Sequence, residues 1–260
     1  MKHWTLITGA SEGIGKEFAR IAAKEGRSVI LAARSEDKLN QLAEDLRSNT
    51  VQVEVIPADL SRIEDTAALW DRATADGRIV DVLVNNAGLG RNGVFGDGTD
   101  WDRELLSIQV NMTALTYLMK KAIPHMQNNG GGRILNVAST AAFMPGPNMA
   151  VYHATKAYVL SLSEAVAEEL RGSKVTITAL CPGATQSNFF NEADMHDVTL
   201  VNMGKLPTAR SVAELGWIGM RGGKRIVVTG FQNKVFAFLP RISPRSFVTR
   251  IAKYFLSKGS

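Results

Sequence analysis

The stretch Thr8-Gly9-Ala10-Ser11-Glu12-Gly13-Ile14-Gly15 is the strongest indication of the fold, because it sets three glycines between an apolar run and a helical pattern. The apolar run Trp4–Thr8 is predicted to be a strand, and the helical pattern continues to about Glu25. Glycines allow a tight turn and a close approach of the backbone to a pyrophosphate, which the free N–H groups of a helix N-terminus then stabilise. The stretch therefore predicts a dinucleotide site, with a simple glycine-rich turn as the alternative.

Outward from this turn, short β-branched runs alternate with longer helical patterns. We expect strands at Trp4–Thr8, Val29–Ala33, Val51–Ile56, Val80–Asn85, Arg133–Ala138, Val175–Leu180 and Arg225–Thr229. Most of these runs are continuously apolar, as in a parallel sheet whose two faces are both covered. The sequence thus predicts a doubly wound, Rossmann-type α/β fold with a parallel seven-stranded sheet and helices on both faces.

Two segments depart from the alternation. No Pro/Ser-rich linker divides the chain, so residues 1–230 are predicted to form a single dinucleotide-binding and catalytic domain. Within it, residues 188–208 form an irregular insert that we expect to cover a substrate. The insert carries Phe189, Phe190, Met195, His196, Leu200, Val201 and Met203. Residues 231–260 are predicted to form a basic, aromatic C-terminal extension.

Composition narrows the class of protein. Of the 260 residues, 45% are hydrophobic and 21% are charged, as in a globular protein. The single cysteine, Cys181, excludes an intrachain disulfide and fits a reducing compartment. We see no signal-peptide pattern at the N-terminus and no apolar stretch long enough to span a bilayer, so we expect a cytoplasmic protein. The four histidines lack metal-ligand spacing, so no metal is expected.

The net charge of +5 belongs to the end of the chain, because no Asp or Glu follows Glu214. A helix is expected from Ser243 as N-cap, with Phe247, Ile251 and Phe255 at helical spacing. Three interpretations stay open. The extension packs on the domain or on a neighbouring subunit, anchors the protein peripherally at a membrane surface, or docks an acidic carrier protein. Nucleic-acid binding is not expected, since no recognition module is visible.

The end of the second predicted strand indicates which nicotinamide cofactor is bound. NAD sites usually place a carboxylate there, but this strand ends Leu31-Ala32-Ala33-Arg34. Arg34 can pair bidentately with a 2′-phosphate, and Ser11 can add a hydroxyl donor. The sequence therefore favours NADP(H); in the alternative interpretation Arg34 is a solvated surface charge.

A second group of residues carries the predicted chemistry. Ser139 follows the fifth strand, and Tyr152 and Lys156 lie four residues apart in a helical pattern, so they share a helix face. A nearby cation lowers the pKa of a phenol, which can then exchange a proton with a reacting carbonyl oxygen. Tyr152 is the predicted general acid/base; a core tyrosine beside a surface lysine is the alternative.

The chain resembles the compact single-domain branch of the short-chain dehydrogenase/reductase family, from about Lys2 to Gly230. Five separated motifs carry the resemblance. They are Thr8-Gly9-x-x-x-Gly13-Ile14-Gly15, Asp59-Leu60, Asn85-Asn86-Ala87-Gly88, the set Ser139, Tyr152 and Lys156, and Pro182-Gly183.

The resemblance implies a role for each motif. Gly9, Ser11, Gly13, Ile14 and Gly15 would hold the pyrophosphate side, Asp59-Leu60 the adenine, and Asn86-Ala87-Gly88 the adenosine side. Asn111 would be the fourth catalytic residue, holding a water that links Lys156 to solvent. Lys156 would also bind the nicotinamide ribose, and Ser139 the reacting oxygen. Pro182, Gly183, Thr185 and Ser187, the last in place of the commoner threonine, would contact the carboxamide.

We therefore expect an NADP(H)-dependent oxidoreductase that transfers a hydride between nicotinamide and a carbonyl or alcohol. The apolar insert, with Phe143 and Met144 near the site, favours a 3-oxoacyl, steroid-like or other lipophilic ketone. The alternative function is a dinucleotide-binding regulatory or scaffold protein without turnover. By analogy with the family, a homodimer or homotetramer would form through two helices, at about Trp101–Gln127 and Val151–Arg171.

Overall fold

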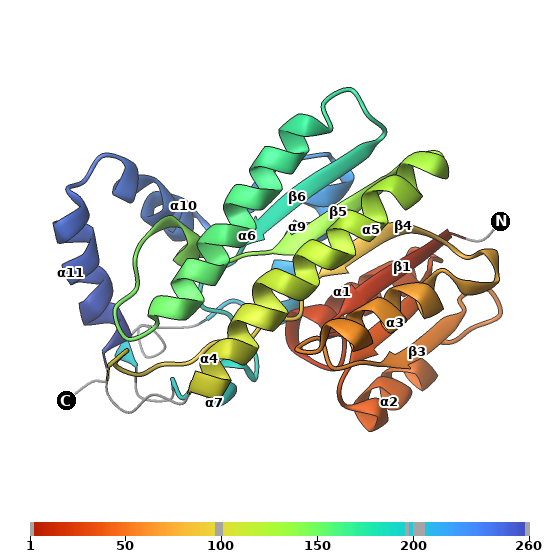
Figure 1. Ribbon diagram of the computed structural model, residues 1–260, viewed down its shortest axis with the longest axis horizontal. Helices are drawn as coiled ribbons and strands as arrows, with labels where there is room; N and C mark the ends of the chain where they lie inside the picture. The colour runs from red at the N-terminus through yellow and green to blue at the C-terminus, as the bar shows by residue number, and fades with distance from the viewer. Residues whose placement is uncertain (1–2, 97–100, 196–197, 200–205, 258–260) are drawn as a thin grey trace.

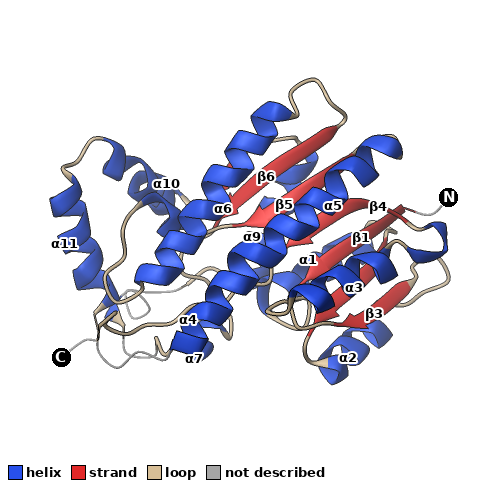
Figure 2. Cartoon of the chain, viewed as in Figure 1, coloured by secondary structure: helices blue, strands red, loops and turns tan. Residues whose placement is uncertain are grey.

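The computed structural model describes residues 3–96, 101–195, 198–199 and 206–257, and in them it confirms the predicted sheet (Figures 1 and 2). All seven strands are parallel, in the order β3-β2-β1-β4-β5-β6-β7. They are β1 His3–Thr8, β2 Ser28–Ala33, β3 Val53–Pro57, β4 Ile79–Asn85, β5 Gly132–Val137, β6 Val175–Cys181 and β7 Ile226–Val228. The strand order reverses between β1 and β4, where ligands bind in open α/β sheets.

Helices cover both faces of this sheet. The longer ones are α1 Gly13–Lys24, α2 Glu36–Leu46, α3 Ile63–Ala73, α4 Trp101–Ile108, α5 Leu115–Asn128, α6 Ala150–Glu169, α9 Ala209–Arg221, α10 Phe231–Phe238 and α11 Arg245–Leu256. The shorter ones are α7 Phe189–Glu192, the 3₁₀ turns η1 Ala75–Gly77, η3 Thr140–Phe143 and η4 Leu239–Arg241, and the π-helical segment η2 Gln109–Ala114 between α4 and α5.

Two apolar clusters hold the layers together. One joins the sheet to α1, α2 and α9 through residues such as Phe18, Leu39 and Trp217. The other joins the opposite face to α3, α5 and α6 through residues such as Leu69 and Leu118. Because both faces are buried, the strands consist of continuous apolar runs, as the sequence indicates.

The insert and the extension both lie near the carboxyl ends of the strands (Figure 1). The insert contributes α7 and the buried side chains of Met195 and Val198, whereas His196, Leu200, Val201 and Met203 lie outside the described residues. The extension forms α10, η4 and α11, drawn in blue in Figure 1. Within the part of the chain described, no helix combines the length and apolarity needed to cross a bilayer.

The predicted start of the last helix, with Ser243 as N-cap and Pro244 as its first residue, is one residue too early. The helix α11 begins at Arg245 with Pro244 in the N-cap position, so the Ser243 side chain does not cap it. The residues at helical spacing, Phe247, Ile251 and Phe255, are not the buried side of α11, whose buried residues are Val248, Ala252 and Leu256. Phe247 and Ile251 face outward instead.

Candidate functional site

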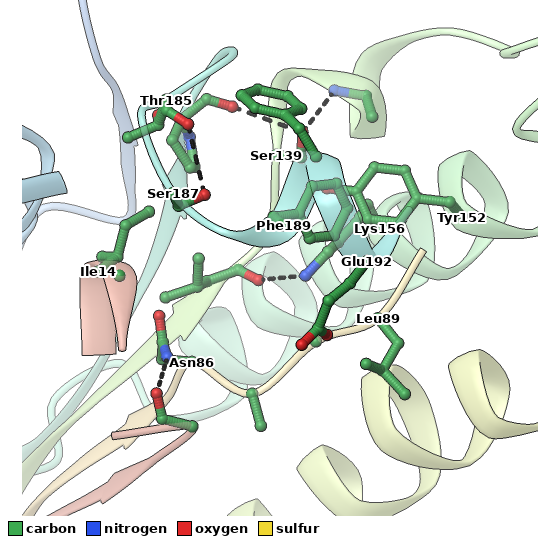
Figure 3. Close-up of a pocket in the computed structure, with 18 of the residues that line it drawn as sticks. Ile14, Asn86, Leu89, Ser139, Tyr152, Lys156, Thr185, Ser187, Phe189 and Glu192 are labelled. Atoms are coloured by element: carbon green, nitrogen blue, oxygen red, sulfur yellow. Dashed lines mark hydrogen bonds between the residues drawn. The ribbon is translucent and has the colours of Figure 1, made fainter. Parts of the chain in front are cut away.

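A cavity of about 960 Å³ runs along the carboxyl edge of the sheet, from the glycine turn to the two C-terminal helices. It brings together most of the residues singled out in the sequence. Those that line it are Gly9, Ser11, Gly13, Ile14, Arg34, Asp59, Leu60, Asn86, Ala87, Gly88, Ser139, Tyr152, Lys156, Pro182, Gly183, Thr185 and Ser187. Figure 3 shows part of this lining. Gly15 and Asn111 lie behind the wall and act on it through their neighbours.

The glycine turn is tight because its neighbours leave no room for side chains. Gly9 has a φ of +62°, and a Cβ there would lie 2.9 Å from the Cα of Ala87. A Cβ on Gly15 would lie 2.2 Å from the carbonyl oxygen of Gly9. The Asn86 amide fastens the turn by donating to the carbonyls of Thr8 (3.0 Å) and Gly9 (3.1 Å). The turn thus has the close backbone approach that a pyrophosphate needs.

The N-terminus of α1 lies at the cavity, because its first residues, Gly13 and Ile14, line the wall. Glu12 is the N-cap residue, but its carboxylate does not cap the helix. It accepts instead from Lys38 Nζ at 3.1 Å and from the Asn188 amide at 3.3 Å. The positive end of the helix dipole therefore faces the cavity without a side chain of its own covering it, as in an anion site.

Cations and hydroxyls gather at the end of the cavity beside the glycine turn, where the family resemblance implies the adenosine. Arg34 is exposed at the rim, near Ser11 and Ser35. Lys38, in the first turn of α2, lines the same rim. Lys38 was not predicted from the sequence, because no motif or helical spacing connects it to Arg34, which precedes the helix. Below them, Asp59 accepts from the backbone N–H (3.0 Å) and hydroxyl (2.8 Å) of Ser61, which fixes its carboxylate at the cavity wall.

Ser139, Tyr152 and Lys156 meet at the opposite end. The Ser139 hydroxyl accepts from the Ala141 N–H at 3.1 Å and is hydrogen-bonded to the Tyr152 phenol. Lys156 is buried, and its ammonium donates to the carbonyl of Val137 at 2.8 Å, a bond visible in Figure 3. The same nitrogen lies 5.8 Å from the centroid of the Tyr152 ring. The phenol, the hydroxyl and the ammonium therefore share one end of the cavity.

The predicted lowering of the tyrosine pKa is not what the structure gives. Burial raises the pKa of Tyr152 to about 12, and the hydrogen bond with Ser139 opposes the rise. Burial likewise lowers the pKa of Lys156 to about 8. For both side chains, the cost of burying the charged form outweighs the stabilisation that its neighbours give that form. The Tyr152 phenol is consequently held in its protonated form at neutral pH, ready to donate.

Asn111 is placed by a distortion in its helix. It lies in the π-helical segment η2, a feature frequent at functional sites. Its amide oxygen accepts from the Leu89 N–H (2.8 Å), and its nitrogen donates to the Leu89 carbonyl (2.8 Å) and the Thr155 hydroxyl (2.9 Å). A Cβ on Gly88 would lie 3.1 Å from Lys156 Nζ and 3.3 Å from this amide oxygen, so the two groups converge there. The water-holding role of Asn111 stays a prediction.

The segment after β6 closes the cavity between the two ends. The Pro182 carbonyl accepts from the Thr140 N–H at 2.8 Å, which ties the segment to the turn that follows Ser139. The Thr185 hydroxyl donates to the Gly183 carbonyl at 2.9 Å. A Cβ on Gly13 would touch Ser187 at 3.4 Å, so the segment also reaches the glycine turn.

The end of the cavity at Tyr152, where a substrate is expected, has apolar walls that the sequence only partly predicted. The Phe189 ring of the insert lies 5.2 Å from the Tyr152 ring, centroid to centroid. Gly90 makes this approach possible, because a Cβ there would lie 2.8 Å from Phe189 and 2.9 Å from Tyr152. The extension adds Phe236 and Phe255 to the lining. No sequence signal linked the extension to the site, since its helices reach the cavity only through the fold.

A family model described as short chain dehydrogenase matches residues 3–197. The chain belongs to the short-chain dehydrogenase/reductase family. As a member it is an oxidoreductase that acts between CH–OH and C=O groups with NAD or NADP.

The similarity to known proteins covers nearly the whole length of the dehydrogenase. It is 32% identical to the ketoacyl reductase HetN of Nostoc sp., over 96% of this chain and 88% of the relative. A short-chain dehydrogenase from Sphingobium yanoikuyae, in complex with NADPH, superposes with a TM-score of 0.81 at 32% identity and covers 89% of each chain. Another from Burkholderia phymatum, in complex with NAD, has a TM-score of 0.82 at 26% identity and covers 92% of each chain.

Proposed function

We propose that this dehydrogenase uses NADP(H) to interconvert a hydrophobic ketone and its alcohol, with Tyr152 as the general acid/base. The observation that carries the proposal is the meeting of Ser139, Tyr152 and Lys156 at one end of a cavity whose other end is the glycine turn. The turn fits a dinucleotide, since Gly9 and Gly15 leave space that a Cβ would fill. When bound, the nicotinamide supplies the hydride for reduction and accepts it for oxidation.

The protein side chains handle the proton. In reduction the Tyr152 phenol donates its proton to the carbonyl oxygen as negative charge develops there. The Ser139 hydroxyl holds the same oxygen, and the Lys156 ammonium stabilises the phenolate that remains. In oxidation the phenolate takes the hydroxyl proton back. Asn111, which meets Lys156 beside Gly88, is proposed to position the water that reprotonates the pair.

The wall of the substrate end supports an apolar substrate. Phe189, Phe236, Phe255 and Leu256 line it, together with Met149 and Met195. Such a surface binds apolar groups and offers few hydrogen-bond partners to a sugar. A 3-oxoacyl compound, a steroid-like ketone or another lipophilic ketone fits best, and the similarity to a ketoacyl reductase supports the first.

The test of the chemistry is NADPH consumption with a panel of hydrophobic ketones. Tyr152→Phe removes only the phenolic hydroxyl and should lower kcat by at least about 100-fold. Tyr158→Phe is the matched control. It lies on the same helix, bonds Thr116 at 2.9 Å and lies outside the cavity, so it should keep its rate. Equal turnover in wild type and Tyr152→Phe would remove the mechanism, and no turnover with any ketone would favour the regulatory alternative.

The cofactor preference rests on the cations at the adenosine rim. Arg34→Ala should weaken NADPH binding by roughly 10- to 100-fold and leave NADH binding nearly unchanged, because only NADPH carries the 2′-phosphate. Lys38→Ala should act in the same direction. Lys24→Ala, an exposed cation at the end of α1, is the control. An unchanged ratio of the two dissociation constants in Arg34→Ala would show that Arg34 is a surface charge.

We also propose that the enzyme is a homodimer or homotetramer and that it works in the cytoplasm. The helices α4, α5 and α6 present the faces through which the family resemblance implies association, and Trp101 is exposed there. Cys181 is buried and free, as suits a reducing compartment. Sedimentation of the purified enzyme measures the oligomeric state directly.

A further inference from the structure

The helices α10 and α11 carry the same apolar pattern on the sides that face away from the protein. In α10 the stripe is Phe231, Val235 and Phe238, and in α11 it is Phe247, Ile251 and Tyr254, each at positions i, i+4 and i+7. Ile242 lies in the connection between them. We call these seven side chains the outer face. Their exposed fractions are 80, 41 and 56% in α10, 69% at Ile242, and 56, 40 and 68% in α11.

The outer face is not needed for the packing of the extension. Its inner side buries Ala237, Val248, Ala252 and Leu256. Phe236 and Phe255 line the cavity and contact each other with ring centroids 6.3 Å apart. Seven exposed apolar residues grouped on two adjacent helices are more than the scattered ones found on most surfaces, and such a patch marks an interaction site.

The charged residues of the extension that carries the outer face all have one sign. Lys234 and Arg250 each follow the first residue of their stripe by three positions, so each flanks its stripe in the same way. Arg241, Arg245 and Lys253 add to them, and no Asp or Glu follows Glu214. Aromatic and aliphatic anchors edged by cations are typical of a helix that lies in the interface of an anionic bilayer. A second copy of the chain would instead bring like charges together across a symmetric contact.

We propose that the outer face docks on an anionic phospholipid surface. The Phe side chains enter the boundary between head groups and acyl chains, while Lys234, Arg250 and the cations of the connection contact lipid phosphates. The docking is independent of the substrate, since none of the outer-face residues lines the cavity.

The experiment is flotation of the full-length protein with two kinds of vesicle, phosphatidylcholine alone and equal parts of phosphatidylcholine and phosphatidylglycerol. Wild type should float with the mixed vesicles and not with phosphatidylcholine alone. Phe231→Ser with Phe247→Ser, and separately Lys234→Gln with Arg250→Gln, should each lower the partition coefficient at least about tenfold.

Two matched controls separate the outer face from surface properties in general. Ile218→Ser removes an apolar side chain, 65% exposed on α9, and Lys120→Gln with Lys174→Gln removes two exposed cations elsewhere. Both should float like wild type. Reduction of a water-soluble ketone should stay within about twofold in all four variants, which separates docking from the proposed activity.

Three results would overturn the proposal. The first is failure of wild type to float with the mixed vesicles, and the second is flotation that the outer-face variants do not change. The third is a fall in the molar mass of the free protein caused by Phe231→Ser with Phe247→Ser, which would show a second copy to be the occupant.

Discussion

Among single residues, Lys156 has a proposed role in the site but lowers the stability of the fold, because its charge is buried. It is buried, with a pKa of about 8, below its ordinary 10.5, because of that burial. Between these two values the unfolded chain binds more protons than the folded chain, so stability rises with pH from about 8 to 10.5, and the penalty is complete below 8.

Lys156→Met should therefore stabilise the protein at neutral pH by roughly 1–3 kcal/mol while it abolishes turnover. The gain should shrink as the pH rises towards about 10, where wild-type Lys156 is neutral in the folded state. Urea unfolding at the two pH values measures this, with the exposed Lys120→Met as control. A gain that does not vary with pH would mean that methionine packs better, and that charge is not the cause.

Sequence signals identified those site residues whose role is local. The glycines of the turn, and the spacing of Tyr152 and Lys156, can be recognised because neighbours in the chain stay neighbours in space. Asn111 could be named only through the family resemblance, since its partners Leu89 and Thr155 lie 22 and 44 residues away. Phe255 in the cavity wall was beyond prediction for the same reason. The direction of the Tyr152 pKa was wrong because burial cannot be read from spacing.

At the scale of the element, the C-terminus of α11 is held to the site by two asparagines. The buried Asn92 donates from its amide to the Leu256 carbonyl at 3.0 Å, and Asn148 donates to the same oxygen at 3.4 Å. Leu256 also packs in a small cluster with Met149 and Met195, beside Tyr152. These contacts set which side of α11 is buried, and the periodicity of the helix alone could not reveal it.

Asn92→Ala should loosen α11 and with it the wall of the substrate end. We expect a loss of about 1 kcal/mol in the free energy of unfolding, from one buried hydrogen bond. The KM for a hydrophobic ketone should rise by roughly threefold or more, with kcat little changed. The reason is that a smaller fraction of the enzyme has α11 in the position that binds the ketone. Asn129→Ala is the control, since Asn129 bonds the His125 carbonyl at 2.8 Å at the end of α5. A similar KM in both variants would show that Asn92 has only a structural role.

At the scale of the whole molecule, alternating apolar runs and helical patterns were enough to predict the sheet. The central strands are buried on both faces and so differ in composition from the helices around them. The relation of the extension to the sheet was left open by the sequence, because three partners fitted its composition. In the structure the inner side of the extension lines the cavity. Whether residues 1–230 form a complete domain without the extension can therefore be tested by removing it.

We predict that a chain ending at Gly230 still folds cooperatively and binds NADPH, because all seven strands and the glycine turn lie before that residue. It should lose the wall made by Phe236, Phe255 and Leu256. With part of that apolar contact gone, the KM for a bulky hydrophobic ketone should rise at least about tenfold, and the KM for a small water-soluble one much less. Full-length Phe236→Ala with Phe255→Ala should reproduce the selective change. Loss of cooperative unfolding or of NADPH binding in the shortened chain would show instead that the extension is part of the domain core.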